Sequence, residues 1–549
     1  MSEIISLVQS VLQRIDLKPG STTITEVVEY SLKYPEEFAE AVFLHFRGGT
    51  TQAAVDVDNL RRTLGDGDAG VRRREWVNAV GNQRVCPIEL LTPRSRVDLQ
   101  GIVNRARGAG IHVKAVGSGH SFSDVVQTTG FLVDTTELSR TLPLEPHLLH
   151  PTADASTLFR VEGGIKINDL NELLWEEGLA LPNMGGYAGQ SIAGAISTAT
   201  HGSGLGLPPL CDMVASIEIV AADGNVYRIE PTAGITNPAA FAAAHPDVAL
   251  RQDDTWFRAV VAGLGCMGLV YAVTLRVQPR YWLAETRFLS KWSVVRAQLI
   301  AGAVLATNRH YEVLVNPYRL NGDHTCLVTV RNPAPEPTLP TFLRPDRQIA
   351  PAIISASQLA ENVLVWFLGE FPRFTPYLID KAMETLVDGE GGAPYVDRGY
   401  RVLDLGPVNN ESVYATEIAF PMTTYLDGVD RILALAAQAQ SLGDIYQTSP
   451  ISLRFVAGSA QFMAMQEGAP RCMIEMPILS GTRGGREILS RYRAAAAPLG
   501  GRCHWGEMQE VTSASVTALY PEAPRWSAIR AILDPGRMFD NSFTARTGL

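Results

Sequence analysis

The stretch Val116-Gly117-Ser118-Gly119-His120-Ser121-Phe122-Ser123 places one histidine inside a glycine-rich loop. It follows Ile-His-Val-Lys-Ala at 111–115, an alternating run that predicts a short strand. Gly117 and Gly119 permit positive φ and a close approach of the backbone to a ligand, and the serine hydroxyls add hydrogen-bond donors. The loop therefore suits a phosphate, with His120 beside the molecule that carries it. The alternative is a strand-to-turn junction with a surface histidine, because short motifs also occur by chance.

A second glycine-rich segment, GGYAGQSIAGAISTATHGSG at 185–204, lies about 70 residues further along the chain. Two such loops predict two walls around one extended ligand that contains phosphate. A third segment, GLGCMG at 263–268, has the GxGxxG pattern of dinucleotide sites, which requires a strand before the glycines and a helix after them. Here 254–262 predicts a helix before the motif, and 269–277 predicts a strand after it. The order is reversed, and the sequence argues against a Rossmann site.

Together with LDPGRMFDN at 533–541, these segments resemble the vanillyl-alcohol-oxidase (PCMH-type) family of FAD-linked flavoproteins. Within it the chain is most similar to the sugar-lactone and alditol oxidases and to the covalent-flavin cholesterol oxidases. The resemblance covers roughly residues 76–280 and 519–549. It implies an α+β fold, in which a PCMH-type FAD-binding domain of two subdomains is joined to an α/β cap, the substrate domain, over the flavin.

The resemblance also divides the chain. Residues 1–75 are expected to form a helical N-terminal extension and linker, 76–280 the FAD-binding domain, 281–518 the cap and 519–549 a return to the FAD-binding domain. The segment 340–387 within the cap is rich in aromatic residues and predicts helices. It either lines a hydrophobic pocket, lies on a membrane surface or forms core helices, and the last interpretation is favoured for apolar helical stripes.

The resemblance implies that His120 is bonded covalently to the 8α-methyl of FAD, as an 8α-N-histidyl linkage. An imidazolyl substituent withdraws electrons, raises the flavin potential and favours hydride uptake from an alcohol. The cysteine-bearing pattern of doubly linked members is missing, so a single bond is expected. His201 is expected to contact FAD and not to act as a base. The predicted FAD contacts are Val116, Gly117, Ser118, Gly119, His120, Ser121, Phe122, Gly185, Gly189, Ser191, Ile192, Gly194, Ala195, Thr198, His201, Gly202, Gly268, Val270 and Asn541.

In the family, the residue that matches Gly185 lies beside the flavin C4a. A small residue there admits dioxygen, whereas a larger one marks the dehydrogenases. Glycine therefore favours an oxidase that returns electrons to dioxygen and produces hydrogen peroxide. A dehydrogenase with another electron acceptor and a flavin-binding protein without catalysis are the competing classes.

The predicted cap departs from its relatives at charged positions. Alditol and lactone oxidases show Glu-x-Arg, a histidine about 21 residues after that arginine, and later His-Trp-x-Lys. Arg454 is retained here, but Ser452 stands in place of the glutamate. Glu475 stands in place of the histidine. In the last motif His504 is retained, and Glu507 replaces the lysine.

These changes predict an acidic catalytic pocket. Arg454 is expected to stabilise negative charge at the flavin N1/C2=O. Glu475, Glu507 and Glu417 are candidate catalytic carboxylates, because close carboxylates raise one another's pKa and one of them then titrates near neutral pH. The alternative is that one or more of them forms a structural ion pair with Arg454, Arg471 or Arg502. The predicted substrate contacts are Ser191, Ser452 and His504.

The lost lysine disfavours sugar lactones and simple alditols as substrates. A bulky, largely apolar alcohol fits the aromatic segment and the resemblance to cholesterol oxidases. A cationic amine fits the excess of carboxylates, because an ammonium group would satisfy them. The alcohol is preferred, and the amine stays open.

Composition limits the partners. The 549 residues hold 57 acids and 47 bases, and the net charge of −10 argues against nucleic acid or an anionic membrane as partner. No apolar run reaches the roughly 20 residues that span a bilayer. Six cysteines without a CxxC pair predict buried thiols, and no metal is predicted. The first residues lack the features of a secretory signal, which predicts the cytoplasm. The expected partners are a small-molecule substrate and dioxygen, and the oligomeric state stays open.

Overall fold

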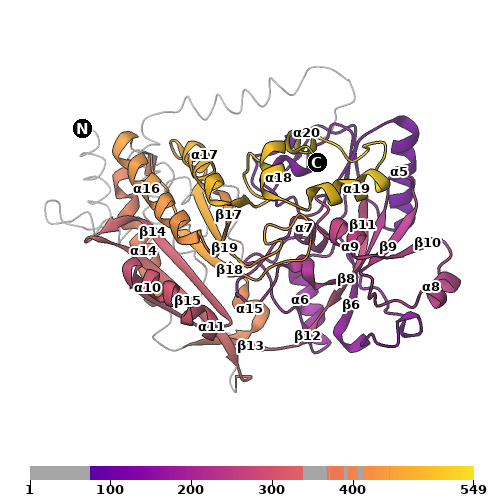
Figure 1. The fold of residues 1–549 in the computed structure, drawn as a ribbon, viewed down its shortest axis with the longest axis horizontal. Helices are drawn as coiled ribbons and strands as arrows, with labels where there is room; N and C mark the ends of the chain where they lie inside the picture. Colours follow the sequence, from indigo (N-terminus) through magenta and orange to yellow (C-terminus); the bar gives the residue numbers. More distant parts are fainter. Residues whose placement is uncertain (1–74, 338–367, 370, 389–393, 406–412, 444) are drawn as a thin grey trace, which may run out of the picture.

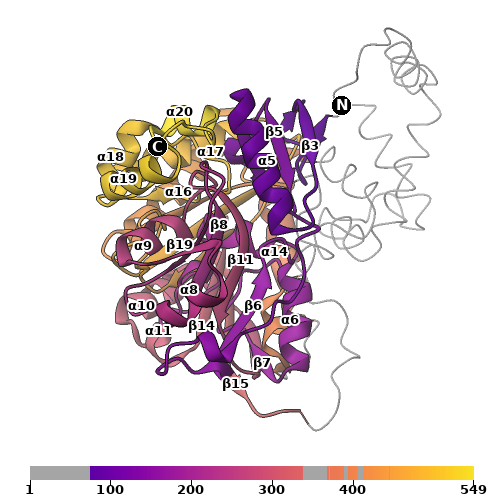
Figure 2. The same cartoon turned by 90° about the vertical axis from the view of Figure 1, so that its right-hand side faces the viewer.

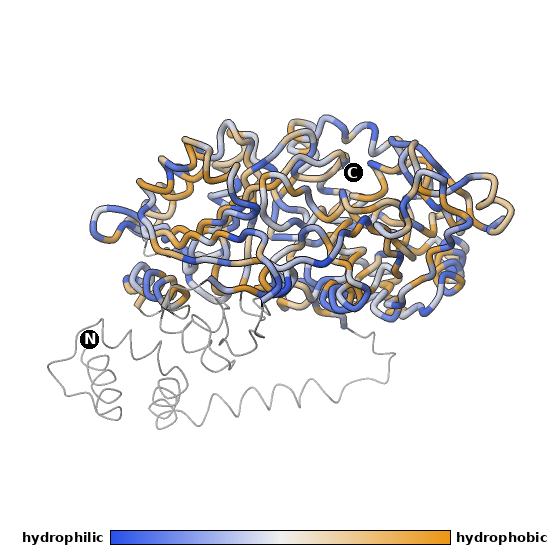
Figure 3. The backbone as a smooth tube through the Cα atoms, turned by 90° about the horizontal axis from the view of Figure 1, so that it is seen from below, coloured by the Kyte–Doolittle hydropathy of each residue, from blue (hydrophilic) through white to orange (hydrophobic). Residues whose placement is uncertain are grey.

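The computed structural model describes residues 75–337, 368–369, 371–388, 394–405, 413–443 and 445–549. Residues 1–74 of the predicted helical extension and most of the segment 340–387 lie outside these residues. Hydrophobic and hydrophilic segments alternate along the described chain (Figure 3), and none of its helices is long and apolar enough to cross a membrane. All six cysteines are free thiols, and four of them are buried as predicted, whereas Cys86 is exposed and Cys503 is half-buried.

A parallel sheet of three strands supports the first glycine-rich loop. In spatial order it consists of β3 (Glu89–Leu91), β5 (Phe131–Asp134) and β4 (Val113–Val116). Helix α5 (Arg96–Ala109) connects β3 to β4. It begins where the Ser95 hydroxyl accepts a hydrogen bond from the Asp98 N–H, and it ends at Gly110, whose φ of +64° suits a glycine. The loop 117–123 leaves the carboxyl end of β4, as the sequence predicts.

A mixed sheet of five strands lies beside it. In spatial order it consists of β10 (Val248–Gln252), β9 (Val226–Glu230), β8 (Val214–Val220), β11 (Leu269–Arg276) and β6 (Leu158–Glu162). Strands β8 and β9 form an antiparallel hairpin, whose turn contains Gly224 at φ +81°. Helix α9 (Asp254–Val261) precedes the GLGCMG segment and β11 follows it. The reversed order that argues against a Rossmann site is therefore present in the fold.

Short helices and strands complete this half. They are β1 (Trp76–Val77), β2 (Arg84–Val85), α6 (Ile167–Glu176), β7 (Leu179–Ala180), α7 (Ile192–Ser197), α8 (Pro238–Ala244) and β12 (Gln278–Pro279). The C-terminal helices α18 (Ser513–Leu519), α19 (Ala523–Leu533) and α20 (Ser542–Thr547) return to the same half. Figure 2 shows these three together, and the Trp526 indole of α19 donates to the Ala262 carbonyl at the end of α9.

The other half is an antiparallel sheet of eight strands. In spatial order it consists of β16 (Tyr395–Arg398), β13 (Trp282–Lys291), β15 (Asp323–Ala334), β14 (His310–Leu320), β18 (Ile451–Val456), β19 (Arg471–Leu479), β17 (Val413–Pro421) and β20 (Arg502–Cys503). Its helices are α10 (Trp292–Ala301), α11 (Ala303–Thr307), α14 (Thr375–Asp388), α15 (Gly399–Leu403), α16 (Tyr425–Gly443) and α17 (Gly485–Ala496). Figure 1 shows α14 and α16 on the side away from the five-stranded sheet.

Apolar and polar side chains alternate along the central strands, so the two faces of this sheet differ in character. Ile418 and Phe420 of β17 belong to the apolar core that includes Ile379 and Met383 of α14. Glu417, which directly precedes Ile418, lines a cavity on the opposite face, because successive strand residues point to opposite sides. The described part of the aromatic-rich segment thus forms a core helix. The predicted α+β fold is confirmed, and the exact domain boundaries stay a prediction.

Candidate active site

A cavity of about 260 Å³ lies between the glycine-rich loops and the central strands of the eight-stranded sheet. Its wall contains residues from both halves, and most of the predicted site residues are among them. These are Val116, Gly117, Ser118, Gly119, His120, Ser121, Phe122, Gly185, Ser191, Gly194, Ala195, Thr198, His201, Gly268, Val270, Glu417, Arg454, Glu475, His504 and Glu507. The structure therefore brings together motifs that lie almost 400 residues apart in the sequence.

The two main glycine loops touch each other in this wall. The Ser191 N–H donates to the Ser118 hydroxyl at 3.0 Å. A Cβ on Gly117 would lie 2.0 Å from the Ser191 hydroxyl oxygen, so no larger residue fits there without a rearrangement. Gly268 has φ +137°, and a Cβ there would lie 2.6 Å from the Val220 carbonyl oxygen. Glycine at these positions keeps the backbone close to the cavity.

His120 lies against the ring of Tyr187, with centroids 4.4 Å apart and planes inclined by 25°. Burial lowers the pKa of His120 to about 4, so its imidazole is neutral at pH 7. Tyr187 also lines the cavity, and the sequence patterns did not single it out. Its position two residues after Gly185, inside the second glycine-rich segment, was the available signal.

Three strands align the polar residues of the opposite wall. Glu475 of β19 lies directly opposite Glu417 of β17 on one side and Ser452 of β18 on the other. Two carboxylates placed opposite each other are destabilising unless cations compensate them. Arg454, two residues after Ser452 and so on the same face, forms an ion pair with Glu475. The ion-pairing alternative is therefore realised for Glu475.

Glu417 pairs with a histidine and not with one of the arginines that the sequence suggested. Its Oε2 lies 2.9 Å from His201 Nε2, while His201 Nδ1 donates to the Gly202 carbonyl at 2.9 Å. Since Nδ1 must carry a proton, a further proton lies between Nε2 and the carboxylate. Burial opposes ionisation of Glu417, but the charge and hydrogen bond of His201 outweigh it and lower the pKa of Glu417. Glu417 is thus ionised at neutral pH.

The segment 504–507 joins this wall to the first glycine-rich loop. The Phe122 N–H donates to the Gly506 carbonyl at 2.6 Å, and the Ser123 hydroxyl donates to the Trp505 carbonyl at 2.6 Å. His504 Nδ1 accepts a hydrogen bond from the Gly506 N–H at 3.0 Å, which leaves its proton on Nε2. Burial lowers the pKa of His504 to about 4. The segment carries a neutral imidazole and, at its end, Glu507.

Glu507 is the carboxyl group with the strongest perturbation in the cavity. Burial, followed by the nearby Glu417 carboxylate, raises its pKa well above the ordinary range. Its Oε2 atom is buried and has no hydrogen-bond partner among the described residues. A carboxyl group in this state holds its proton more firmly than an exposed glutamate and can exchange it with a ligand in the cavity.

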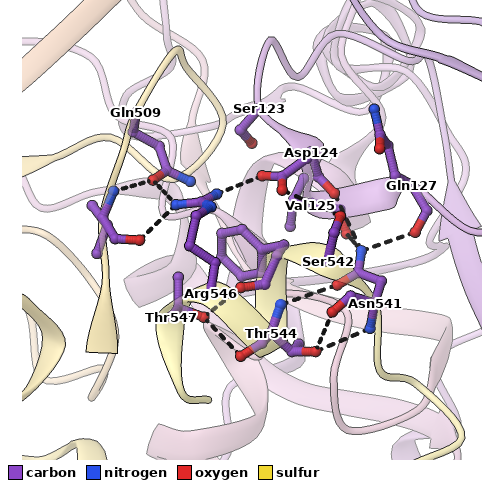
Figure 4. A network of polar contacts seen from close by, with 12 residues as sticks. Ser123, Asp124, Val125, Gln127, Gln509, Asn541, Ser542, Thr544, Arg546 and Thr547 are labelled. Carbon is purple, nitrogen blue, oxygen red and sulfur yellow. Dashed lines mark hydrogen bonds and ion pairs between the residues drawn. The ribbon is translucent and has the colours of Figure 1, made fainter. Parts of the chain in front are cut away.

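Five predicted site residues lie outside the cavity wall, and these are Gly189, Ile192, Gly202, Ser452 and Asn541. The Asn541 amide donates to the carbonyl groups of residues 124, 125 and 127 at 3.0–3.2 Å (Figure 4). Arg546 forms an ion pair with Asp124 at 2.6 Å in the same network. Asn541 therefore holds the segment that follows the first glycine-rich loop. Ser452 lies beside Arg454, whose Nε donates to its hydroxyl at 3.4 Å.

The residues present fit a large anionic cofactor. The buried Lys114 ammonium also lines the cavity, where it donates to the Gly265 carbonyl at 3.2 Å. A cation next to several glycine backbones suits phosphate groups. Buried oxygens of Gln190 and Thr200, both in the wall, lack partners among the described residues and are available to a ligand.

Comparisons with known families agree with this architecture. The model of an FAD binding domain matches residues 87–230. The model of the D-arabinono-1,4-lactone oxidase family matches residues 273–547, which is half of the chain. The chain belongs to the D-arabinono-1,4-lactone oxidase family. It is an FAD-dependent oxidoreductase, as the resemblance of its motifs implies.

Several proteins related to this family resemble the chain over most of its length. An L-gulono-1,4-lactone dehydrogenase of Mycobacterium tuberculosis is 29% identical over 86% of this chain and 98% of its own. An alditol oxidase of a Streptomyces species is 24% identical over 85% of this chain and 97% of its own. A solved structure titled solvent-stable cholesterol oxidase has a TM-score of 0.67 at 15% identity, over 87% of this chain and 98% of its own. The resemblance stated from the motifs is confirmed.

Proposed function

We propose that the protein is an oxidase that removes hydride from a CH–OH carbon, with FAD bonded at His120 and dioxygen as the final acceptor. The observation that carries the proposal is the single cavity that holds His120, both glycine loops, Arg454 and the carboxyl group of Glu507. When bound, FAD supplies the hydride acceptor. Oxidation converts the alcohol to a carbonyl compound and yields hydrogen peroxide.

The side chains of the cavity accept the proton and stabilise the charge that develops during the reaction. Glu507, once ionised, accepts the hydroxyl proton, because it is the carboxyl group there without an ion-pair partner among the described residues. Arg454 stabilises negative charge that develops in the cavity, and Glu475 holds its guanidinium in place. Glu417 is paired with His201, so its role is electrostatic.

The charged residues of the cavity wall support a polar substrate. None of its residues comes from the described part of the segment 340–387, and several are charged. The preference for a bulky apolar alcohol, made from the sequence, finds no support in this lining. Relatives named for gulonolactone, arabinonolactone and alditols also favour a hydroxylated compound. We propose a small polyhydroxylated alcohol.

Gly185 supports dioxygen as the acceptor. It lies in the cavity wall, and a Cβ there would lie 3.3 Å from both the His201 carbonyl oxygen and the Thr200 Cγ2. The test is to reduce the flavin anaerobically and then mix it with dioxygen. Rapid reoxidation with one hydrogen peroxide per flavin supports an oxidase, whereas slow reoxidation that an artificial acceptor accelerates indicates a dehydrogenase.

Replacing His120 tests the covalent linkage. Acid precipitation of the wild-type protein should leave flavin on the peptide that contains His120, and His120→Ala should release all of it as intact FAD. Loss of the electron-withdrawing substituent should also lower the flavin potential and slow turnover. Peptide mass mapping identifies the bonded residue. Flavin retained on the pellet of His120→Ala would refute the assignment.

Tyr187 is expected to position the His120 ring for this bond. Tyr187→Ala removes the stacked ring and should lower the covalent fraction, while Tyr187→Phe keeps the ring and should preserve it. The ratio of pellet to supernatant flavin after acid precipitation measures the effect. Equal covalent fractions in both variants would show that the stacking has no part in attachment.

A further inference from the structure

We propose that the substrate is an amino alcohol, whose ammonium group binds between Glu417 and Glu507 while the neighbouring CH–OH carbon is oxidised. The inference rests on the proposed oxidation of an alcohol and specifies, in addition, that the substrate carries a positive charge. Glu417 Oε1 and Glu507 Oε2 are buried oxygens with no hydrogen-bond partner among the described residues. Both side chains line the cavity, and Glu417 is only 3% exposed. Two unpartnered oxygens in one wall are available to donors from a ligand.

Among the described residues of the cavity, one carboxyl group, that of Glu507, has no cationic partner. Arg454 is paired with Glu475, and His201 is paired with Glu417. The imidazoles of His120 and His504 are neutral at pH 7, since burial lowers both pKa values to about 4. Lys114, also in the wall, donates to the Gly265 carbonyl and so faces another part of the cavity. A cation from the ligand would balance the negative charge that Glu507 acquires when it loses its proton, and Glu507 stands where the alditol and lactone oxidases carry lysine.

An ammonium group fits these acceptors better than a metal ion does. His201, Glu417 and His504 each offer a possible metal-ligating atom, and these atoms lie within 4.8 Å of one another. Both His201 nitrogens are already hydrogen-bonded, and His504 Nδ1 accepts a backbone N–H. A metal ion would have to displace these bonds. An ammonium group donates to the free oxygens and leaves the existing bonds intact.

The same charges argue that the amino group is recognised and not oxidised. Carboxylates stabilise an amine in its protonated form, which has no lone pair to assist loss of hydride from its carbon. The hydroxyl group has no such obstacle. Its proton passes to Glu507, the hydride passes to FAD, and the C–O bond becomes a carbonyl bond. Dioxygen then takes up two electrons and two protons and becomes hydrogen peroxide. The cation also offsets the repulsion between the two carboxylates, which favours the ionised form of Glu507.

Matched ligands that differ in charge test this inference. We suggest Tris against pentaerythritol, and 2-amino-2-deoxy-D-glucitol against D-glucitol, titrated anaerobically at pH 7 into the FAD-loaded protein. A shift of the visible flavin absorbance reports binding, and bleaching reports oxidation. The amino member of each pair should bind about tenfold more tightly or better, because a charge-assisted hydrogen bond replaces a neutral one.

Glu507→Gln should remove most of this preference, and Glu510→Gln is the matched control. Glu510 is an exposed acid three residues away that is not part of the cavity wall. Equal or tighter binding of the neutral members, or binding of none of the four ligands, would overturn the inference. If the neutral members bind equally well or more tightly and D-glucitol bleaches the flavin, the inference fails but the proposed alcohol oxidation is supported. Preferential binding of both amino members without any bleaching would support the ammonium site and count against oxidation of these alcohols.

Discussion

Glu507→Gln is expected to slow anaerobic flavin reduction by about 10²–10⁴-fold, the usual contribution of a positioned proton acceptor. The amide of the variant keeps the shape of the carboxyl group but cannot accept a proton. Stopped-flow absorbance at saturating substrate measures the rate directly. FAD content should be unchanged, since the variant alters none of the glycine loops. Reduction as fast as in the wild-type protein would remove Glu507 from the mechanism.

The pH dependence gives a second readout for the same residue. Burial, followed by the Glu417 carboxylate, raises the pKa of Glu507, and the nearby Arg454 guanidinium only partly opposes this rise. The wild-type rate of reduction should therefore increase with pH as Glu507 loses its proton, with an apparent pKa above the ordinary glutamate range. Glu507→Gln should lose this limb. Glu510→Gln should keep both the rate and the profile.

Glu507→Gln should raise the stability of the folded protein although it lowers the rate of flavin reduction. When folding raises the pKa of a carboxyl group, that group keeps its proton in the native state at pH values where the unfolded chain has already ionised. The group therefore destabilises the native state more and more as the pH rises above the pKa that it has in the unfolded chain. Glu507→Gln removes this effect. The variant should melt at a higher temperature than the wild-type protein, and the difference should be larger at pH 8 than at pH 5. A gain in stability together with a loss of rate is typical of a functional carboxyl group.

The sequence predicted the fold from patterns that are local. Loop 117–123 follows its strand, α9 precedes GLGCMG and β11 follows it, and each of these depends on neighbouring residues. Their grouping around one cavity came from the family resemblance, which supplied long-range contacts that periodicity cannot give. For the segment 340–387, the sequence favoured core helices over an apolar pocket or a membrane surface, and the described helix α14 packs into a core.

The pairing of charges was the part that sequence could not decide. Glu475 and Glu417 were both candidates in the sequence, although 58 residues separate them. Strand register places them opposite each other, and only then does it become clear that Arg454 compensates one and His201 the other. Tyr187 was missed because a single tyrosine in a glycine-rich segment has no periodic signature. Asn541 was predicted to contact FAD from its motif; its amide donates to loop carbonyls, and the FAD contact stays a prediction.

Arg454→Met is expected to lower the rate of flavin reduction by about 10²–10³-fold, because a fixed cation that faces developing charge contributes on this scale. The variant also leaves Glu475 without its partner in a partly buried position, since only 22% of that side chain is exposed. An uncompensated carboxylate destabilises the protein, so a lower melting temperature is expected as well. The rate and the stability must therefore be separated.

The double variant Arg454→Met/Glu475→Met achieves this separation. Removing both charges should restore much of the lost stability, because neither partner is left uncompensated. It should not restore the rate, because the cation is still absent. Stopped-flow reduction and thermal melts on the wild-type, the two single variants and the double variant complete the cycle. A double variant that regains the wild-type rate would show that Arg454 serves only to neutralise Glu475. A double variant that is stable yet slow would place the guanidinium among the groups that stabilise the charge formed during oxidation.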